Sequence, residues 1–157
     1  MIKLVRVDHR LLHGQVAVSW FNALDANTIF VVNDEVAKDE FRKDAIRLAK
    51  PSNAKLVMQS VDKAINSINS GITDKYAMLI VVGNVVDAIK LINSTHGAIK
   101  SLNLGGTRPG ENKKAYSATI NLTDKEHEEL IALEKQGIEV YIQQVPNDTK
   151  KELDYRR

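Results

Sequence analysis

The chain of 157 residues contains no cysteine. This absence excludes disulfide bonds, thiolate metal sites and a thiol nucleophile. Any covalent catalysis must therefore use a histidine, serine, threonine, lysine or carboxylate side chain.

The chain also lacks a strong excess of charge and a long apolar segment. Its 22 Lys and Arg against 20 Asp and Glu give a formal net charge of +2, without the basic stripe typical of nucleic-acid-binding proteins. The longest apolar run, residues 77–82, is far shorter than the roughly 20 residues that cross a bilayer. The amino terminus has no signal-peptide pattern. We therefore expect a soluble, cytoplasmic protein that binds no nucleic acid.

Short apolar segments alternate with amphipathic segments over nearly the whole chain. The apolar segments predict strands, and apolar residues spaced by three and four positions predict helices. The predicted strands are residues 2–7, 28–32, 56–58, 76–82, 101–104, 118–121 and 139–143. The predicted helices are residues 15–24, 39–49, 61–71, 85–92 and 123–137, followed by a short, partly frayed helix after Pro146.

The helix predicted over residues 39–49 carries a regular apolar stripe. Phe41, Ala45, Leu48 and Ala49 fall at i, i+4, i+7 and i+8, and charged residues take most of the remaining face. This pattern is typical of an amphipathic helix whose apolar stripe packs on the core.

Repeated strand–helix–strand alternation favours the α/β class. We expect a single domain over residues 1–157, with a mostly parallel, open twisted sheet and helices on both faces. No linker, low-complexity block or internal repeat suggests a second domain. In such sheets, ligands bind beyond the carboxyl ends of the strands.

The segment DHRLLHGQ, residues 8–15, lies between the first predicted strand and the first predicted helix. His13 and Gly14 therefore fall at the helix start, where free N–H groups and the helix dipole attract an anion. Arg10 can offer its guanidinium to phosphate oxygens, and Asp8 can accept from an imidazole N–H and fix its tautomer. These residues are the parts of a phosphohistidine site.

Simpler interpretations of the same segment stay open. Asp8 and Arg10 can form an exposed ion pair worth about 1 kcal/mol or less, and Gly14 can be a turn glycine. His9 and His13 have the spacing of a helical metal pair, but no HExxH glutamate accompanies them, so no metal is expected.

Two other segments end predicted strands and are candidates for the same crevice. Gly105 and Gly106 begin a basic loop with Arg108, which is consistent with an anion-binding rim or with a plain solvated turn. The loop lacks the order of a P-loop, so no nucleotide cofactor is indicated. Asn33 and Asp34 can face the crevice or serve as turn and helix-cap residues.

Four motifs in order along the chain resemble one protein family. RVDHRLLHGQV, VVNDEVAKDEFRK, LNLGGTRP and GIEVYIQQVP are similar to the IIB component of the mannose/fructose/sorbose family of the bacterial phosphoenolpyruvate-dependent sugar phosphotransferase system. The resemblance covers nearly the whole chain, and the first of the four motifs is specific.

The resemblance implies a cytoplasmic phosphocarrier, peripherally associated with a membrane permease. Such a carrier accepts a phosphoryl group from the IIA component on a histidine and passes it to sugar held by the membrane IIC and IID components. The family histidine falls on His13 and its loop arginine on Arg10. His9 stands where family members often have an acidic residue, so it is given no role.

In physical terms, this function requires charge neutralisation around the phosphoryl group. We expect amides near Gly14, the guanidinium of Arg10 and backbone N–H groups of Gly105 and Gly106 to supply it, without a metal or other cofactor. The resemblance allows a homodimer. It leaves the sugar open between hexoses and amino sugars such as N-acetylgalactosamine.

Two rival functions are considered. A histidine phosphatase or mutase also has a His-Gly pair after its first strand, but that family reads Arg-His-Gly, whereas Leu12 precedes His13 here. A non-catalytic binding module would use the apolar residues around Leu11 and Leu12.

Overall fold

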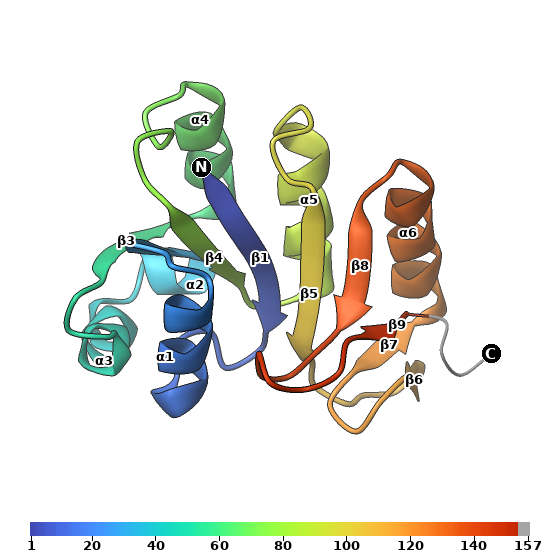
Figure 1. The fold of residues 1–157 in the computed structure, drawn as a ribbon. Coiled ribbons are helices and arrows are strands. Elements are labelled where there is room, and N and C mark those ends of the chain that lie inside the picture. Colours follow the sequence, from blue (N-terminus) through green and yellow to red (C-terminus); the bar gives the residue numbers. More distant parts are fainter. Residues whose placement is uncertain (154–157) are drawn as a thin grey trace.

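A seven-stranded sheet lies at the centre of the fold, which a computed structural model describes for residues 1–153 (Figure 1). Its strands are β1 (Ile2–Asp8), β2 (Thr28–Val32), β3 (Lys55–Gln59), β4 (Met78–Val82), β5 (Ser101–Gly106), β8 (Glu139–Ile142) and β9 (Lys151–Glu152). Their order is β3-β2-β4-β1-β5-β8-β9, and only β9 is antiparallel to its neighbour. The predicted α/β class and the mostly parallel sheet are confirmed.

Helices cover both faces of this sheet (Figure 1). They are α1 (Gly14–Ala23), α2 (Asp34–Ala37), α3 (Glu40–Ala49), α4 (Val61–Asn69), α5 (Val85–Ser94) and α6 (Asp124–Lys135). The core cluster on one face draws on α4, α5 and α6, and the cluster on the other draws on α1, α2 and α3. The prediction of helices on both faces is therefore confirmed.

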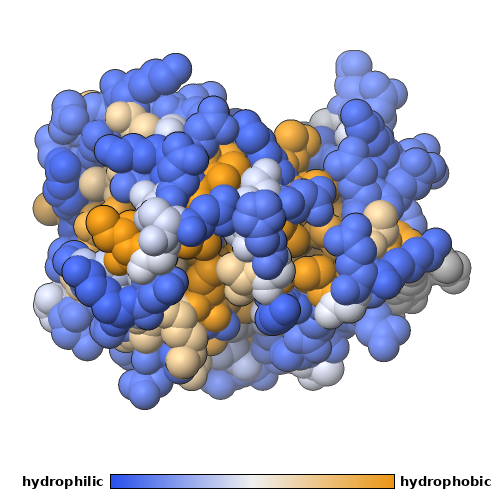
Figure 2. All heavy atoms as spheres, turned by 90° about the horizontal axis from the view of Figure 1, so that it is seen from above, coloured by the Kyte–Doolittle hydropathy of each residue, from blue (hydrophilic) through white to orange (hydrophobic). Residues whose placement is uncertain are grey.

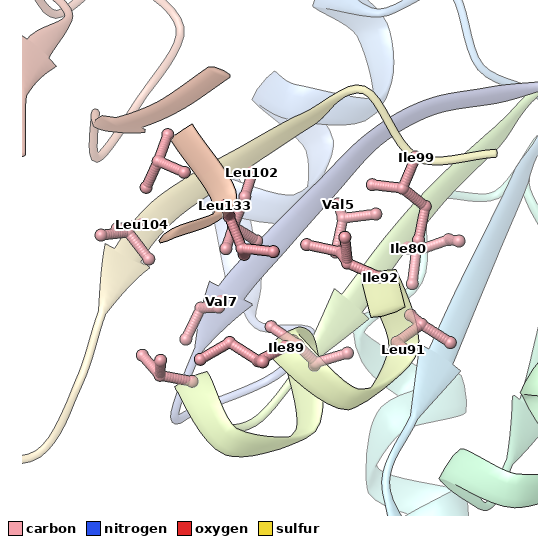
Figure 3. Packing of buried hydrophobic residues seen from close by; sticks show 14 of the residues in the cluster. Val5, Val7, Ile80, Ile89, Leu91, Ile92, Ile99, Leu102, Leu104 and Leu133 are labelled. Atoms are coloured by element: carbon pink, nitrogen blue, oxygen red, sulfur yellow. The ribbon is translucent and has the colours of Figure 1, made fainter. Parts of the chain in front are cut away.

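The larger core cluster packs α5 against the middle strands. Ile89 and Ile92 of α5 point toward Val5 and Val7 of β1 (Figure 3). Each of these side chains is at most 7% exposed. Burial of such aliphatic side chains is the main favourable term in folding.

The second cluster packs α1 and α3 on the opposite face. Phe21 of α1 and Ile46 of α3 belong to it together with Ile29 and Val31 of β2. Viewed from above Figure 1, hydrophobic surface shows in the middle of the molecule and hydrophilic side chains surround it (Figure 2). This distribution fits a sheet buried between two helical layers.

Most of the apolar stripe predicted on the helix over residues 39–49 does not face the core, and of its four residues only Ala49 packs against the second cluster. In α3, Phe41 is 84% exposed and Leu48 is 90% exposed, and Ala45 is exposed as well. Ile46, outside the predicted stripe, is the buried residue of this helix. Asp39, in the short connection from α2, caps α3 by accepting from the Arg42 amide, and the helix that begins there turns Ile46 toward the second core cluster.

The carboxyl-terminal third of the chain also differs from the prediction. The strand expected over residues 118–121 begins only at Asn121, as β7 (Asn121–Thr123), and pairs with β6 (Lys113–Ala115), inside the expected loop. The helix expected after Pro146 is wrong within the described residues, because the chain there pairs with β8 as β9. Tyr141 and Ile142 already offer a free strand edge, so backbone pairing determines the structure there. The rest of the expected helix, residues 154–157, lies outside the described residues.

Two leucines on helices test this packing. Leu91→Ala in α5, where the side chain is 0% exposed, should lower the free energy of unfolding by about 2–5 kcal/mol because it leaves a cavity. Leu48→Ala in α3 should change it by less than about 0.5 kcal/mol. Urea denaturation followed by circular dichroism measures both. Equal losses would mean that the stripe of α3 is covered in solution.

Candidate functional site

The segment DHRLLHGQ lies where the connections of the sheet change face. After β1 the chain passes to α1, on one face, whereas the neighbouring strands β4 and β5 are followed by α5 and α6, on the other. Neighbouring strands that lead to opposite faces leave a crevice beyond their carboxyl ends, which is where ligands bind in open α/β sheets. The loop after β1 lies at this edge, at the lower end of the sheet in Figure 1.

A tight turn gives the loop a defined shape. The Leu11 amide donates to the Asp8 carbonyl at 2.9 Å, and Leu11 has a φ of 60°, in the left-handed region. This conformation is costly for a leucine. The burial of Leu11 and Leu12, each 5% exposed, anchors the turn in the second core cluster. Gly14 follows with a φ of 47°, which favours glycine at that position.

The Asp8 carboxylate is the centre of the site. It is 0% exposed, and donors approach both of its oxygens. Oδ2 accepts from His13 Nε2 at 3.0 Å and from Arg6 Nη2 at 3.3 Å. Oδ1 accepts from the Arg10 amide at 3.0 Å and lies 3.5 Å from Arg10 Nε. The carboxylate is therefore held in one orientation by groups from β1, the loop and the start of α1.

This environment keeps Asp8 ionised. Burial raises the pKa of Asp8, but the hydrogen bonds from His13 and from the Arg10 amide, with the charge of Arg6, outweigh burial and leave the pKa below its ordinary value. An ionised carboxylate only accepts hydrogen bonds, so His13 Nε2 carries the proton. Among the described residues, none is hydrogen-bonded to His13 Nδ1, which is the free ring nitrogen.

His13 stands at the one helix start without a side-chain cap among residues 1–153. The other five helices begin with Asn33, Asp39, Ser60, Asn84 or Thr123, whose side chains each accept from a backbone amide of the first turn. At α1 the N-cap residue is His13, and its side chain makes no such bond. The first amides of α1 and the positive end of its dipole therefore stay available to an anion beside the imidazole.

The other two residues of the loop lie on either side of Asp8. Arg10 is 47% exposed, so its guanidinium is free to turn toward a ligand in solvent. His9 is 31% exposed, and its buried Nδ1 has no hydrogen-bond partner within residues 1–153 and lies 4.0 Å from Asp8 Oδ1.

The two predicted glycines, Gly105 and Gly106, have different neighbours in the structure. A Cβ at Gly106 would lie 3.4 Å from His9 Nδ1 and 3.5 Å from Asp8 Oδ1, so Gly106 lies against the site. A Cβ at Gly105 would overlap the guanidinium of Arg6, so Gly105 is inside β5 and makes space for that side chain.

A cleft of about 290 Å³ opens beside His9 at the same edge of the sheet. It is mixed in charge, because basic and acidic side chains both line it. The lining residues are His9, Leu11, Asn33, Glu35, Arg42, Gly83, Asn84, Val85, Thr107, Arg108, Lys113 and Glu126. Two predicted residues, Asn33 and Arg108, are thus at the cleft. Asp34 is not among its lining residues, and its carboxylate accepts from the Val61 amide at 2.9 Å.

Arg6 is the residue that sequence reasoning missed. It lies in β1, two positions before Asp8, and alternate residues of a strand face the same side of a sheet. A charged residue inside the apolar segment MIKLVRV was the available signal.

Comparison with known proteins places the chain in a family. The family described as PTS system sorbose subfamily IIB component matches residues 2–155. The chain belongs to this sorbose subfamily of IIB components. The resemblance seen in the sequence is thereby confirmed, and IIB components are parts of sugar phosphotransferase systems, in which they act with IIA and IIC/IID-type partners.

Individual relatives span nearly the whole chain. The fructose-specific EIIB component of Bacillus subtilis is 29% identical over 152 residues, covering 97% of this chain and 93% of that protein. The mannose-specific EIIAB component of Escherichia coli is 31% identical over 98% of this chain, which covers 47% of that longer protein. The crystal structure of the IIB domain of the sorbose permease from Klebsiella pneumoniae superposes with a TM-score of 0.91 at 28% identity, covering 99% of this chain and 95% of that one.

No helix within residues 1–153 is both long enough and apolar enough to span a membrane. No three His, Asp or Glu side chains there are grouped in a way that could hold a metal ion.

The low pKa of Asp8 predicts how stability depends on pH. Because the folded pKa is below the ordinary 3.8, ionised Asp8 contributes stability that is fully present above that value and is lost as the pH falls through the folded pKa. Asp8→Asn should lower the free energy of unfolding by about 2–3 kcal/mol at neutral pH, since Arg6 loses its carboxylate. The substitution should also make the free energy of unfolding fall less steeply as the pH is lowered, that is, flatten the acid limb of the stability profile. Urea unfolding between about pH 6 and pH 2 measures this profile.

Asp87→Asn is the matched control for this experiment. Burial raises the pKa of Asp87, against the hydrogen bond from Asn84, so its carboxylate contributes no stability that acid removes. Its acid limb should be at least as steep as that of the wild type, because protonation of a carboxyl group with a raised folded pKa adds stability in acid. An equally steep limb in Asp8→Asn would contradict the role given to the Asp8 carboxylate.

Proposed function

We propose that this chain is a phosphocarrier that accepts a phosphoryl group on Nδ1 of His13 and passes it to a sugar. The observation that carries the proposal is the hydrogen bond from His13 Nε2 to Asp8 at 3.0 Å. Since Nε2 is held as a donor, the lone pair of the neutral ring is on Nδ1. A nucleophile needs that lone pair.

The first transfer requires no proton movement. The Nδ1 lone pair forms a bond to phosphorus, and the bond from phosphorus to the donor's histidine nitrogen breaks, leaving that ring with the electron pair. His13 keeps its Nε2 proton, so the phosphorylated ring carries a positive charge that the ionised Asp8 balances. A positively charged ring is also a good leaving group for the second transfer. There the oxygen of a sugar hydroxyl bonds to phosphorus, the bond from phosphorus to Nδ1 breaks and leaves its electron pair on a neutral His13 ring, and the hydroxyl proton is released to solvent.

Charge on the phosphoryl oxygens is neutralised from the exposed side of the ring. Arg10 is close in sequence and half exposed, and its planar guanidinium suits bidentate contact with a phosphoryl group. The uncapped amides at the start of α1 add fixed donors. No metal is needed for these contacts, which is consistent with phosphoryl transfer by positioning and electrostatic stabilisation.

The partners follow from the family. The donor is the phosphohistidine of a IIA component, and the acceptor is sugar held by membrane IIC and IID components. The chain would act in the cytoplasm at the surface of that permease. Relatives named for fructose, N-acetylgalactosamine and sorbose leave both hexoses and amino sugars as substrates. Family membership disfavours a phosphatase or mutase, and the held His13 ring disfavours a purely structural module.

The labelled atom can be mapped directly. With phosphoenolpyruvate, the upstream carriers and a IIA component, wild-type protein should acquire one acid-labile, alkali-stable phosphate, and His13→Ala should acquire none. His9→Ala is the matched control and should still be labelled. Phosphorus–nitrogen couplings in the NMR spectrum of the phosphorylated protein should identify Nδ1.

Two results would overturn this assignment. Labelling retained in His13→Ala would place the phosphate on another residue. Phosphate on Nε2 would mean that the hydrogen bond to Asp8 does not select the nucleophilic nitrogen.

The role of Arg10 is tested by rates. Arg10→Ala should fold as the wild type does, because the side chain is half exposed, and should slow transfer to or from His13 by about 10²–10³-fold. Rapid-quench measurement of both half-reactions tests this. Rates equal to those of the wild type would make Arg10 a surface residue without a role in transfer.

A further inference from the structure

The guanidinium of Arg6 is buried behind the site. The residue is 3% exposed, and its nitrogens contact three separate parts of the chain. Nη2 donates to Asp8 Oδ2 at 3.3 Å, while Nη1 donates to the side chain of Asn103 and, at 3.0 Å, to the Gln143 carbonyl. These contacts join the end of β1 to β5 and to the residue after β8.

Apolar and steric contacts fix the same guanidinium from its flat sides. Its Cζ is 5.3 Å from the centre of the Trp20 ring, a cation–π arrangement. On β5, a Cβ at Gly105 would be 2.2 Å from that Cζ, so the absence of a side chain there gives the guanidinium its place. The Trp20 Nε1–H donates to the Gln144 carbonyl at 3.0 Å, which holds the ring in turn.

A buried charge of this kind is expensive unless it is fully paired. Burial lowers the pKa of Arg6, and the Asp8 carboxylate opposes that change. An apolar side chain would fill the same volume without this cost. Stability alone therefore does not explain the pair of Arg6 and Asp8. Its position indicates a role in the site, because Asp8 Oδ2 is shared between Arg6 and His13.

We propose that Arg6 is a positioning residue of phosphoryl transfer, which acts on His13 through Asp8. It holds the carboxylate in the plane and orientation in which Oδ2 meets His13 Nε2–H. It is too deeply buried to reach the phosphoryl group itself. Without the planar guanidinium of Arg6, the Asp8 carboxylate would be free to rotate. The imidazole of His13 would then lose its fixed tautomer and direction. This inference rests on the proposed function for its effect on rates, but not for its effect on the ring.

The planar guanidinium of Arg6, and not its positive charge alone, is needed to hold Asp8 in this orientation. Arg6→Lys keeps a cation beside Asp8 but cannot bond Asp8, Asn103 and Gln143 together in one plane. It should slow transfer to and from His13 by about 10-fold or more, as loss of a supporting hydrogen-bond partner commonly does. Arg47→Lys is the matched control, since Arg47 is 49% exposed and pairs only with surface acids. Its transfer rates should be unchanged.

Two measurements separate positioning from a merely structural role. In unphosphorylated, ¹⁵N-histidine-labelled protein, the wild type should show His13 as the Nε2–H tautomer with a protected ring proton. Arg6→Lys should show a tautomer mixture with rapid proton exchange. In a double-mutant cycle, Arg6→Lys should slow transfer by less than about 2-fold when Asp8 is already replaced by Asn, because both changes remove the same interaction.

A folded Arg6→Lys protein with wild-type ring spectrum and rates would overturn the proposal, as would a full rate loss that persists in the Asp8→Asn background. If Arg6→Lys does not fold, Asn103→Ala loosens the same guanidinium without changing Arg6 or Asp8. It should shift the tautomer in the same direction, and an unchanged ring would overturn the proposal. If wild-type His13 takes no phosphate, the proposed function fails, while the ring spectra still test Arg6.

Discussion

The buried carboxylate of Asp8 is the constraint on which the rest of the site depends. A fully buried anion requires donors on both oxygens, and the fold supplies them from different directions. Arg6 reaches it along β1 because alternate residues of a strand share a face. The turn after β1 brings the Arg10 amide to it, and the start of α1 brings His13. Satisfying this one charge therefore also sets the loop conformation and the direction of the imidazole.

The start of α1 complements this carboxylate. The other helix starts within residues 1–153 are capped by their own side chains, which makes those amides unavailable. At α1 the amides are not capped by a side chain, and the imidazole of the N-cap residue His13 is bonded to Asp8 instead. The ring is thus held by a fixed negative charge at a helix start, whose dipole is positive. Such a ring is oriented before any donor arrives, which is the condition under which positioning lowers a barrier.

Sequence reasoning found the sheet, most helices and the loop, because apolar periodicity and the position of a loop after a strand are local signals. It failed for features that depend on contacts between residues far apart in the sequence. Two of the partners of Arg6, Asn103 and Gln143, are 97 and 137 residues away, so the residues around Arg6 do not indicate them. The stripe on α3 was correctly recognised as apolar, but periodicity does not tell which side of an edge helix turns inward. In the tail, pairing with a free strand edge outweighed a weak local preference for helix.

Arg6 and Arg10 both contact Asp8, but they differ in burial, and burial determines what each guanidinium can do. A carrier must hold the phosphoryl group strongly enough to receive it and weakly enough to give it away. A guanidinium that is 3% exposed, as in Arg6, is fixed by its surroundings and cannot follow a group that comes and goes. One that is 47% exposed, as in Arg10, can change its position at little cost. In the proposed transfer, the rigid charge of Arg6 therefore suits a role in orienting the ring through Asp8, and the mobile charge of Arg10 suits contact with the group that is transferred.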